Sequence, residues 1–246
     1  MFLVKCILVS LVHVLGVIDG RIFGQNLLNT PIVEGALVGL IMGDMKTGII
    51  MGATLQLIFM GFVGIGVTSL PNSSAGTILA VFFAISSGLD ADSAIALSMP
   101  IALLFQPTGI IPRIINNIFN PRCDRAADRG DYKAIEKYFW LGVLVFAIVF
   151  FVPMLLATYF GQGPVEALIR IIPDVILDGL NKASTLLPAL GIALLMNYIM
   201  DKESTPFLFL GFLLSAYLKM DSLGIAAMGL IIASVYYFFS QKRTLD

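Results

Sequence analysis

Long apolar segments separated by short polar ones make up almost the whole chain. The segments 48–67, 93–112 and 137–160 are each long enough to cross a bilayer as one helix, which takes about 20 residues. Residues 2–18 and 223–240 come close to this length, and we interpret them as membrane segments as well. The pattern therefore predicts an all-α, polytopic membrane protein.

Two apolar segments between these, residues 31–43 and 75–88, are too short to cross. At about 1.5 Å per residue, a segment of this length covers about 20 Å of a hydrocarbon core that is about 30 Å thick. Short apolar pieces are typical of re-entrant or broken half-helices, which lie at membrane depth only where protein buries them or where they line a cavity. A tilted or extended helix with different ends is the alternative interpretation.

The composition also indicates a membrane protein. Hydrophobic residues make up 58% of the 246 residues and charged residues 13%, with a mean hydropathy of +0.94. About a quarter of the residues in a soluble domain are charged, so this chain needs the bilayer as its main solvent. The net charge of −1 and the lack of a basic stripe argue against a nucleic-acid partner.

The chain offers little for catalysis, cofactor binding or metal binding. Cys6 and Cys123 are far apart and form neither a disulfide framework nor a metal-site pattern. The single histidine, His13, lies in an apolar segment, where a packed helix residue is more common than a catalyst. Because it has no P-loop or catalytic-triad motif, the chain is predicted to be no enzyme and to use no cofactor.

The only long hydrophilic stretch, residues 113–137, is predicted to be a cytoplasmic loop within a single membrane domain of residues 1–246. It carries six basic residues, which favour the cytoplasmic side of a membrane. Lys242 and Arg243 place the C-terminus on the same side, so an even number of crossings is expected between them. Residues 164–176 are amphipathic and are predicted to lie at a membrane interface.

Glycines recur at intervals of four residues in the first third of the chain. One set is Gly35, Gly39 and Gly43, and the other is Gly48 and Gly52. Residues spaced in this way share one face of a helix, where the backbone of a second helix can approach closely. We interpret both sets as helix-packing surfaces.

Hydrogen-bonding groups within apolar segments indicate a polar substrate route, because lipid offers such groups no partner. Carboxylates and carboxamides suit a neutral sugar, since they accept hydrogen bonds from adjacent hydroxyls or donate to them. The candidate substrate-binding residues are Asp19, Gln25, Thr54, Gln56, Asn72 and Gln106.

Polar residues in this region also have structural interpretations. Gln56 is the strongest candidate because it lies in the middle of an apolar segment, and an interhelical hydrogen bond of about 1 kcal/mol is its alternative role. Asp44 and Lys46 fit either a ligand site or a charged turn between two helices. Glu34 comes three residues after Pro31, which is typical of a helix start, and we interpret it as a residue of the first turn and not as a ligand.

The string Gly-Asp-Met-Lys-Thr-Gly-Ile-Ile-Met-Gly at residues 43–52 resembles the signature of the IIC component of the mannose-type (mannose–fructose–sorbose) sugar phosphotransferase system. Further motifs that resemble that family follow in order along nearly the whole chain: Pro71-Asn72, Gln106, Asp124-Arg-Ala-Ala-Asp128, Ile172-Pro173-Asp174, Asp178-Gly179-Leu180, Pro206-Phe207 and Leu210-Gly211-Phe212. The resemblance is specific as a set, whereas no single motif is.

The resemblance implies a multi-pass permease subunit of the bacterial inner (plasma) membrane that binds a sugar and carries it inward. It also implies a IID membrane partner and cytoplasmic IIA and IIB components, which relay phosphate from phosphoenolpyruvate and phosphorylate the sugar as it leaves. Similar proteins form trimers of IIC–IID pairs, in which a mobile core moves against a scaffold like an elevator. The IIC component itself would carry no phosphohistidine.

Two departures from the family pattern bear on the sugar. Gln56 occupies a position where relatives commonly have glutamate, and the amide changes the balance of hydrogen-bond donors and acceptors. The stretch Phe62-Val63-Gly64-Ile65 lacks the asparagine that mannose-type members have there. The pair Pro71-Asn72 is more similar to members for N-acetylgalactosamine, galactosamine or sorbose, so an amino sugar or a sorbose-like hexose is expected.

Two functions of other classes remain open from the sequence. An ion- or proton-coupled carrier would use Asp19 and Asp44 and would work without phosphoenolpyruvate. A scaffold or assembly subunit would use the glycine faces to pack a partner, and it would bind no sugar.

Overall fold

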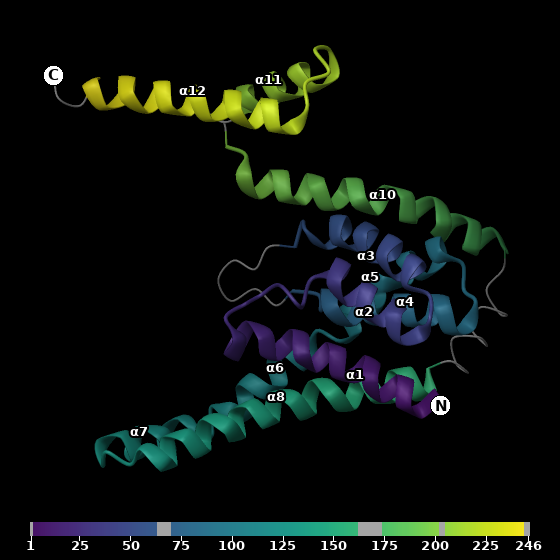
Figure 1. Cartoon of the computed structure of the whole chain (residues 1–246), viewed down its shortest axis with the longest axis vertical. Coiled ribbons are helices and arrows are strands. Elements are labelled where there is room, and N and C mark those ends of the chain that lie inside the picture. The colour runs from purple at the N-terminus through teal and green to yellow at the C-terminus, as the bar shows by residue number, and fades with distance from the viewer. Residues whose placement is uncertain (1, 63–69, 162–173, 202–204, 244–246) are drawn as a thin grey trace. The chain divides into compact units, whose positions relative to one another are not determined.

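The computed structural model describes residues 2–62, 70–161, 174–201 and 205–243, and every regular element in these ranges is a helix (Figure 1). The chain forms two compact units, Met1–Leu195 and Met196–Asp246, which are described separately. The predicted all-α fold is therefore confirmed.

The first unit contains most of the helices of the chain. They are α1 (Phe2–Ile18), the π-helical turn η1 (Asp19–Phe23), α2 (Pro31–Met42), α3 (Met45–Phe59), α4 (Ser73–Ser87), α5 (Ala91–Leu104), α6 (Pro107–Asn116), α7 (Asn120–Asp128), α8 (Tyr132–Phe160) and most of α10 (Asp174–Ile199). The second unit contains the end of α10, α11 (Thr205–Ala216) and α12 (Ser222–Arg243).

Three helical stretches in the described residues are long and apolar enough to cross a membrane: Phe2–Phe23, Ala91–Asp128 and Tyr132–Phe160. The prediction of one spanning helix over residues 48–67 is wrong, because α3 ends at Phe59. Gly61 follows two residues later, and glycine disfavours a helix interior.

The predicted span 93–112 is divided near its centre. Helix α5 ends at Leu104 and α6 begins at Pro107. Proline has no N–H to donate, so the hydrogen-bond ladder is interrupted at Pro107, although Gln106 before it keeps the α conformation. The short segments 31–43 and 75–88 are indeed short helices, α2 and α4, of 12 and 15 residues.

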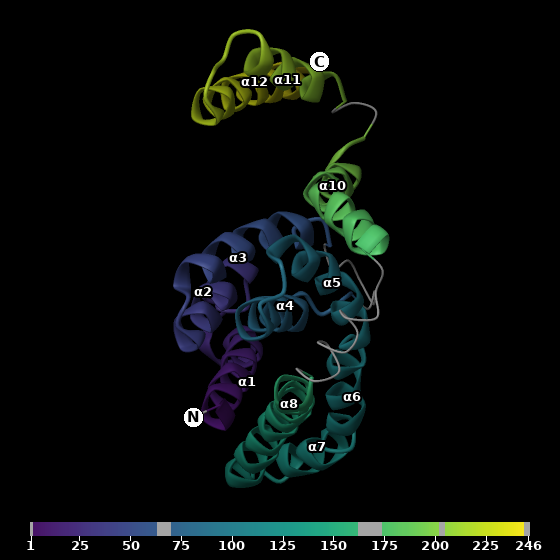
Figure 2. The ribbon, with the colours of Figure 1, turned by 90° about the vertical axis from the view of Figure 1, so that its right-hand side faces the viewer.

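Helix α4 is the centre of the first unit. It packs between α2 on one side and α5 on the other (Figure 2). Its residues from Ser74 to Ala84 are all buried, and Phe82 is the largest of the fully buried side chains in the described core. A helix that is buried over eleven consecutive residues has protein on every face.

The α2–α3 hairpin confirms the glycine interpretation. A Cβ added at Gly39 would lie 3.0 Å from the Cα of Gly48, and one added at Gly35 would lie 2.9 Å from the Cα of Gly52. Since the atoms in the way are backbone atoms, only glycine allows this contact. Gly43 has a different role, because its φ of 97° ends α2 in the left-handed conformation.

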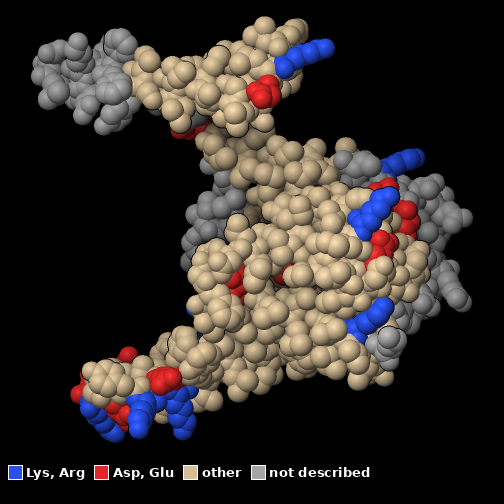
Figure 3. Space-filling model, in the orientation of Figure 1, with Lys and Arg blue, Asp and Glu red and all other residues tan. Residues whose placement is uncertain are grey.

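The predicted hydrophilic loop 113–137 is helical instead, which corrects that prediction. It contains the end of α6, all of α7 and the start of α8, where the Asp131 carboxylate accepts a hydrogen bond from the N–H of Ala134 and caps the helix. Both signs of charge gather at this end of α7 and α8 (Figure 3). The predicted interfacial segment 164–176 lies mostly outside the described residues.

Candidate functional site

The end of α1 forms a compact loop around one carboxylate. Asp19 is fully buried and accepts hydrogen bonds from the side-chain amide of Asn26 at 2.9 Å and from the N–H of Leu28 at 3.2 Å. Gln25 and Leu27 have positive φ angles of 62° and 65°, a conformation that residues other than glycine rarely adopt. The hydrogen bonds to Asp19 thus hold a strained loop in one shape, as is frequent at ligand sites.

The first turn of α2 follows this loop and is contacted by α3. Pro31 is its first residue, as the sequence predicts, and Thr30 is the N-cap residue before it. Oε1 of the half-buried Gln56 lies 3.5 Å from the N–H of Ile32, which has no partner within the helix. The Thr54 hydroxyl instead donates to the Ile50 carbonyl of its own helix, which accounts for its place in an apolar segment.

A third group of predicted residues lies at the start of α4. Asn72 caps this helix by accepting a hydrogen bond from the N–H of Ala75, and its side-chain amide donates to the Thr108 hydroxyl at 3.1 Å. Its own N–H donates to the carbonyl of Ala102, so Asn72 joins α4 to both α5 and α6. Gln106 lies at the α5–α6 turn, two residues before Thr108. The structure therefore places Asn72 and Gln106 near each other.

A buried polar cluster, which the sequence pattern does not reveal, connects these groups. The Ser74 hydroxyl on α4 donates to the Glu34 carboxyl on α2 and shares a 2.7 Å hydrogen bond with Nδ1 of His13 on α1. His13 and Glu34 are fully buried, although we interpreted Glu34 as an ordinary first-turn residue and His13 as packing. The one signal in the sequence was an acidic residue between Pro31 and an uninterrupted apolar run.

The first turns of α2 and α4 thus meet. The Asp19 loop and Gln56 lie beside the first turn of α2, and Asn72 caps α4. Helix N-termini present unpaired N–H groups and a partial positive charge, which bind oxygen atoms. Broken helices in membrane carriers use such ends at their substrate sites. The arrangement offers carboxylate, amide and N–H groups from separate segments to a hydroxylated solute.

Asp44 lies at the turn between α2 and α3, at the opposite end of this hairpin from Ile32 and Gln56. It acts as the N-cap of α3. Its carboxylate accepts hydrogen bonds from the N–H and the hydroxyl of Thr47, at 3.1 and 2.6 Å. The Thr47 hydroxyl, and then its N–H, hold the pKa of Asp44 below its ordinary value. Asp44 therefore lies at the turn between the two helices, as one of its two interpretations has it, whereas Lys46 lies in the first turn of α3.

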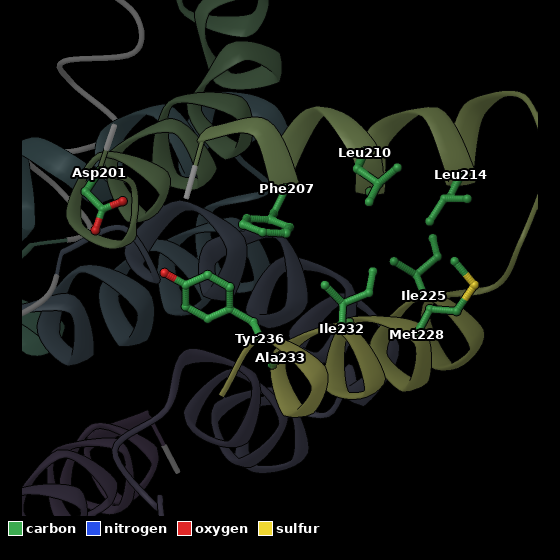
Figure 4. Close-up of a pocket in the computed structure, with 11 residues that line it drawn as sticks. Asp201, Phe207, Leu210, Leu214, Ile225, Met228, Ile232, Ala233 and Tyr236 are labelled. Carbon is green, nitrogen blue, oxygen red and sulfur yellow. The ribbon is translucent and has the colours of Figure 1, made fainter. Parts of the chain in front are cut away.

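The second unit contains a cavity of about 550 Å³ between α11 and α12. Phe207, Leu210 and Leu214 of α11 point toward Ile225 and Ile232 of α12 (Figure 4). Apart from Asp201 and Tyr236, its lining is apolar, which does not suit a sugar. A groove of about 490 Å³ in the first unit is lined by η1, α6, α7 and α8, and it includes none of the predicted site residues.

Comparison with known protein families decides the class. The family model EII-Sor, described as the PTS system sorbose-specific IIC component, matches residues 3–235. The chain belongs to the EII-Sor family. This EII-Sor chain is therefore a sugar permease component of the phosphotransferase system and a multi-pass protein of the inner membrane, and the resemblance seen in its motifs is confirmed.

Individual relatives agree with the family. The EII-Sor chain is 33% identical over 236 residues to the N-acetylgalactosamine permease IIC component 1 of Escherichia coli K12, covering 96% of this chain and 87% of the relative. It is 30% identical over 224 residues to the mannose-specific EIIC component of the same strain, and the match covers 91% of this chain and 84% of the relative. It is also 30% identical over 224 residues to the sorbose-specific EIIC component of Lacticaseibacillus casei, and that match covers 91% of this chain and 81% of the relative.

Solved structures show the same fold. One, described as a membrane protein, has a TM-score of 0.84 and 28% identity and covers 95% of both chains. Another, from a complex of the mannose transporter ManYZ with microcin E492, has a TM-score of 0.61 and 28% identity and covers 96% of both chains. The helical architecture is thus shared with solved membrane proteins, one of them a chain of a mannose transporter complex.

Proposed function

We propose that this IIC chain binds its sugar where the Asp19 loop, Gln56 and the first turn of α2 come together, with Asn72 and Gln106 supporting the adjoining turns. The observation that carries the proposal is the Asp19 loop. A buried carboxylate organises a strained loop next to the first turn of α2, where the Ile32 N–H has no partner within its helix, in an otherwise apolar protein. Such polar groups are costly in a membrane protein and typically mark a substrate route.

The chain works in this proposal as one component of a larger system. A IID membrane subunit completes the permease, and cytoplasmic IIA and IIB components supply the phosphoryl group that the sugar receives as it leaves. The structural similarity to a chain of the ManYZ complex supports a IIC–IID pair. We further propose a trimer of such pairs, surrounded by membrane lipid, and an elevator movement of a core against a scaffold.

The sugar is proposed to be an amino sugar or a sorbose-like hexose. The names of relatives with about 30% identity include sorbose, mannose, fructose and N-acetylgalactosamine. A neutral amide at Gln56 can both donate and accept, and this suits an N-acetyl or hydroxyl group. Uptake of these four sugars, measured separately in cells that supply phosphoenolpyruvate, distinguishes the alternatives.

Replacing Gln56 by leucine is expected to lower sugar uptake about tenfold or more while the protein still inserts into the membrane. The amide makes up to two hydrogen bonds to a sugar, which contribute roughly 1–3 kcal/mol. Uptake of radiolabelled sugar, normalised to the amount of folded protein in the membrane, measures the effect. Leu57→Met, at the exposed neighbouring position, is the matched control. Equal uptake by Gln56→Leu and wild type would contradict the role given to Gln56.

A further inference from the structure

Glu34 is a buried carboxyl group that the proposed sugar contacts do not use. It lies in the first turn of α2, and its Oε1 accepts a hydrogen bond from the Ser74 hydroxyl on α4. Ser74 shares its other hydrogen bond with His13 on α1. Toward α1, a Cβ added at Gly16 would lie 2.8 Å from Oε1 of Glu34. The carboxyl group is therefore enclosed by three helices.

The surroundings of Glu34 do not balance a negative charge. Within the described part of the chain it forms no ion pair, and its Oε2 has no hydrogen-bond partner. An ionised carboxylate here would have one hydrogen bond and no cation. Burying a charge without such compensation costs several kcal/mol, and binding a proton removes the charge.

The hydrogen-bond chain can accommodate that proton. Ser74 has a single hydroxyl proton, so it donates to only one of its two partners. If it donates to Nδ1 of His13, Glu34 must be protonated in order to donate to Ser74. If it donates to Glu34, His13 donates from Nδ1 and the acid proton lies on Oε2. In both directions a neutral Glu34 beside a neutral His13 leaves no buried charge.

We propose that Glu34 binds a proton and, as a neutral acid, positions the sugar-binding turns by joining the first turn of α2 to that of α4. The inference rests on the proposed function, because Ile32, which Gln56 contacts, and Asn72 each lie two residues from the joined pair. Loss of the proton places an anion between the two turns and separates them. Glu34 is thus a positioning residue that acts through Ser74.

Few other charges reach this group. Helix α2 has no other ionisable residue, and α4 has none. Helix α3 has only Lys46, in its first turn, which lies at the opposite end of the hairpin from Glu34. The ionisable groups of α1 and η1 are Lys5, Cys6, His13, Asp19 and Arg21. Of these, only His13 belongs to the hydrogen-bond chain, so Glu34→Gln isolates the titration of Glu34 from that of Asp19.

The test compares wild type, Glu34→Gln and Glu34→Ala as the full-length chain purified with its IID partner. Affinity for N-acetylgalactosamine, sorbose, mannose and fructose is measured from mildly acidic to alkaline pH. In the wild type, affinity is expected to be highest when Glu34 is protonated and to fall roughly tenfold as rising pH removes the proton, a usual size of coupling between two sites. Glu34→Gln, which is always neutral, retains binding and loses this pH dependence, whereas Glu34→Ala binds weakly throughout.

Infrared spectroscopy supplies a readout that is independent of sugar binding. At neutral pH, the wild type is expected to show the carbonyl stretching band of a buried carboxylic acid, which disappears in Glu34→Gln. Absence of this band, or the same pH dependence of affinity in Glu34→Gln as in the wild type, overturns the inference. Failure of the folded wild type to bind any of the four sugars contradicts the proposed function instead, and the infrared band still tests the proton on Glu34.

Discussion

Replacing Gly48 by valine is expected to destabilise the protein by about 3 kcal/mol or more, so that little folded protein reaches the membrane. A Cβ at this position would lie 2.8 Å from the Cα and 3.1 Å from the N of Gly39, and still closer to the carbonyl oxygen of Gly35. These are backbone atoms of α2, so no rotamer change relieves the clash. The α2–α3 hairpin would have to open, and the candidate site would open with it.

Gly109→Ala is the matched control, because Gly109 is also helical but has no atom within 4 Å of an added Cβ. Alanine there is expected to leave stability unchanged or to raise it by about 0.5–1 kcal/mol, since alanine favours a helix. Detergent unfolding followed by circular dichroism measures both variants. Wild-type stability of Gly48→Val would show that the two helices do not cross as closely as described.

Replacing Asp19 by alanine is expected to weaken sugar binding about a hundredfold, or by about 2.7 kcal/mol. The substitution leaves the Asn26 amide and the Leu28 N–H without their acceptor, and hydrogen bonds to a charged group contribute about 1.5–3 kcal/mol each. Without them, the positive φ angles of Gln25 and Leu27 are no longer held. Equilibrium binding of radiolabelled sugar to the purified protein measures the loss.

Asp44→Ala is the control for Asp19, since it removes another carboxylate that accepts two hydrogen bonds at a helix end. It is expected to cost about 1 kcal/mol of stability, the usual value of an N-cap, and to leave sugar affinity unchanged. Loss of uptake in Asp44→Ala at normal protein levels would favour an ion-coupled carrier. Full sugar affinity in Asp19→Ala would exclude the Asp19 loop from the site.

Helices and close glycine contacts could be predicted because local spacing determines them. Repeats of glycine every four residues place Gly35 and Gly39 on one face of α2, and the turn at Gly43 brings that face against α3. Helix ends were less predictable, since α3 ends at Phe59, just before Gly61, although the apolar run in the sequence continues beyond it. The helical charged segment was missed because its polar residues resemble those of a loop.

The polar cluster could not be predicted because its members are distant in sequence. His13 and Ser74 are 61 positions apart, and Ser74 and Glu34 are 40 apart, so only the packing of α1, α2 and α4 brings them together. Thr54 illustrates the opposite case, because its hydroxyl bonds to its own helix. A polar residue type alone does not tell a ligand from a residue that satisfies the backbone, and sugar contact by the six candidates stays a prediction.

The position of bound sugar tests the central claim most directly. A cryo-EM structure of the chain with its IID partner, determined with the sugar that it takes up, is expected to show sugar density between residues 19–32 and Gln56. Density bound elsewhere, such as in the cavity between α11 and α12, with residues 19–32 and Gln56 free of it, would contradict the account.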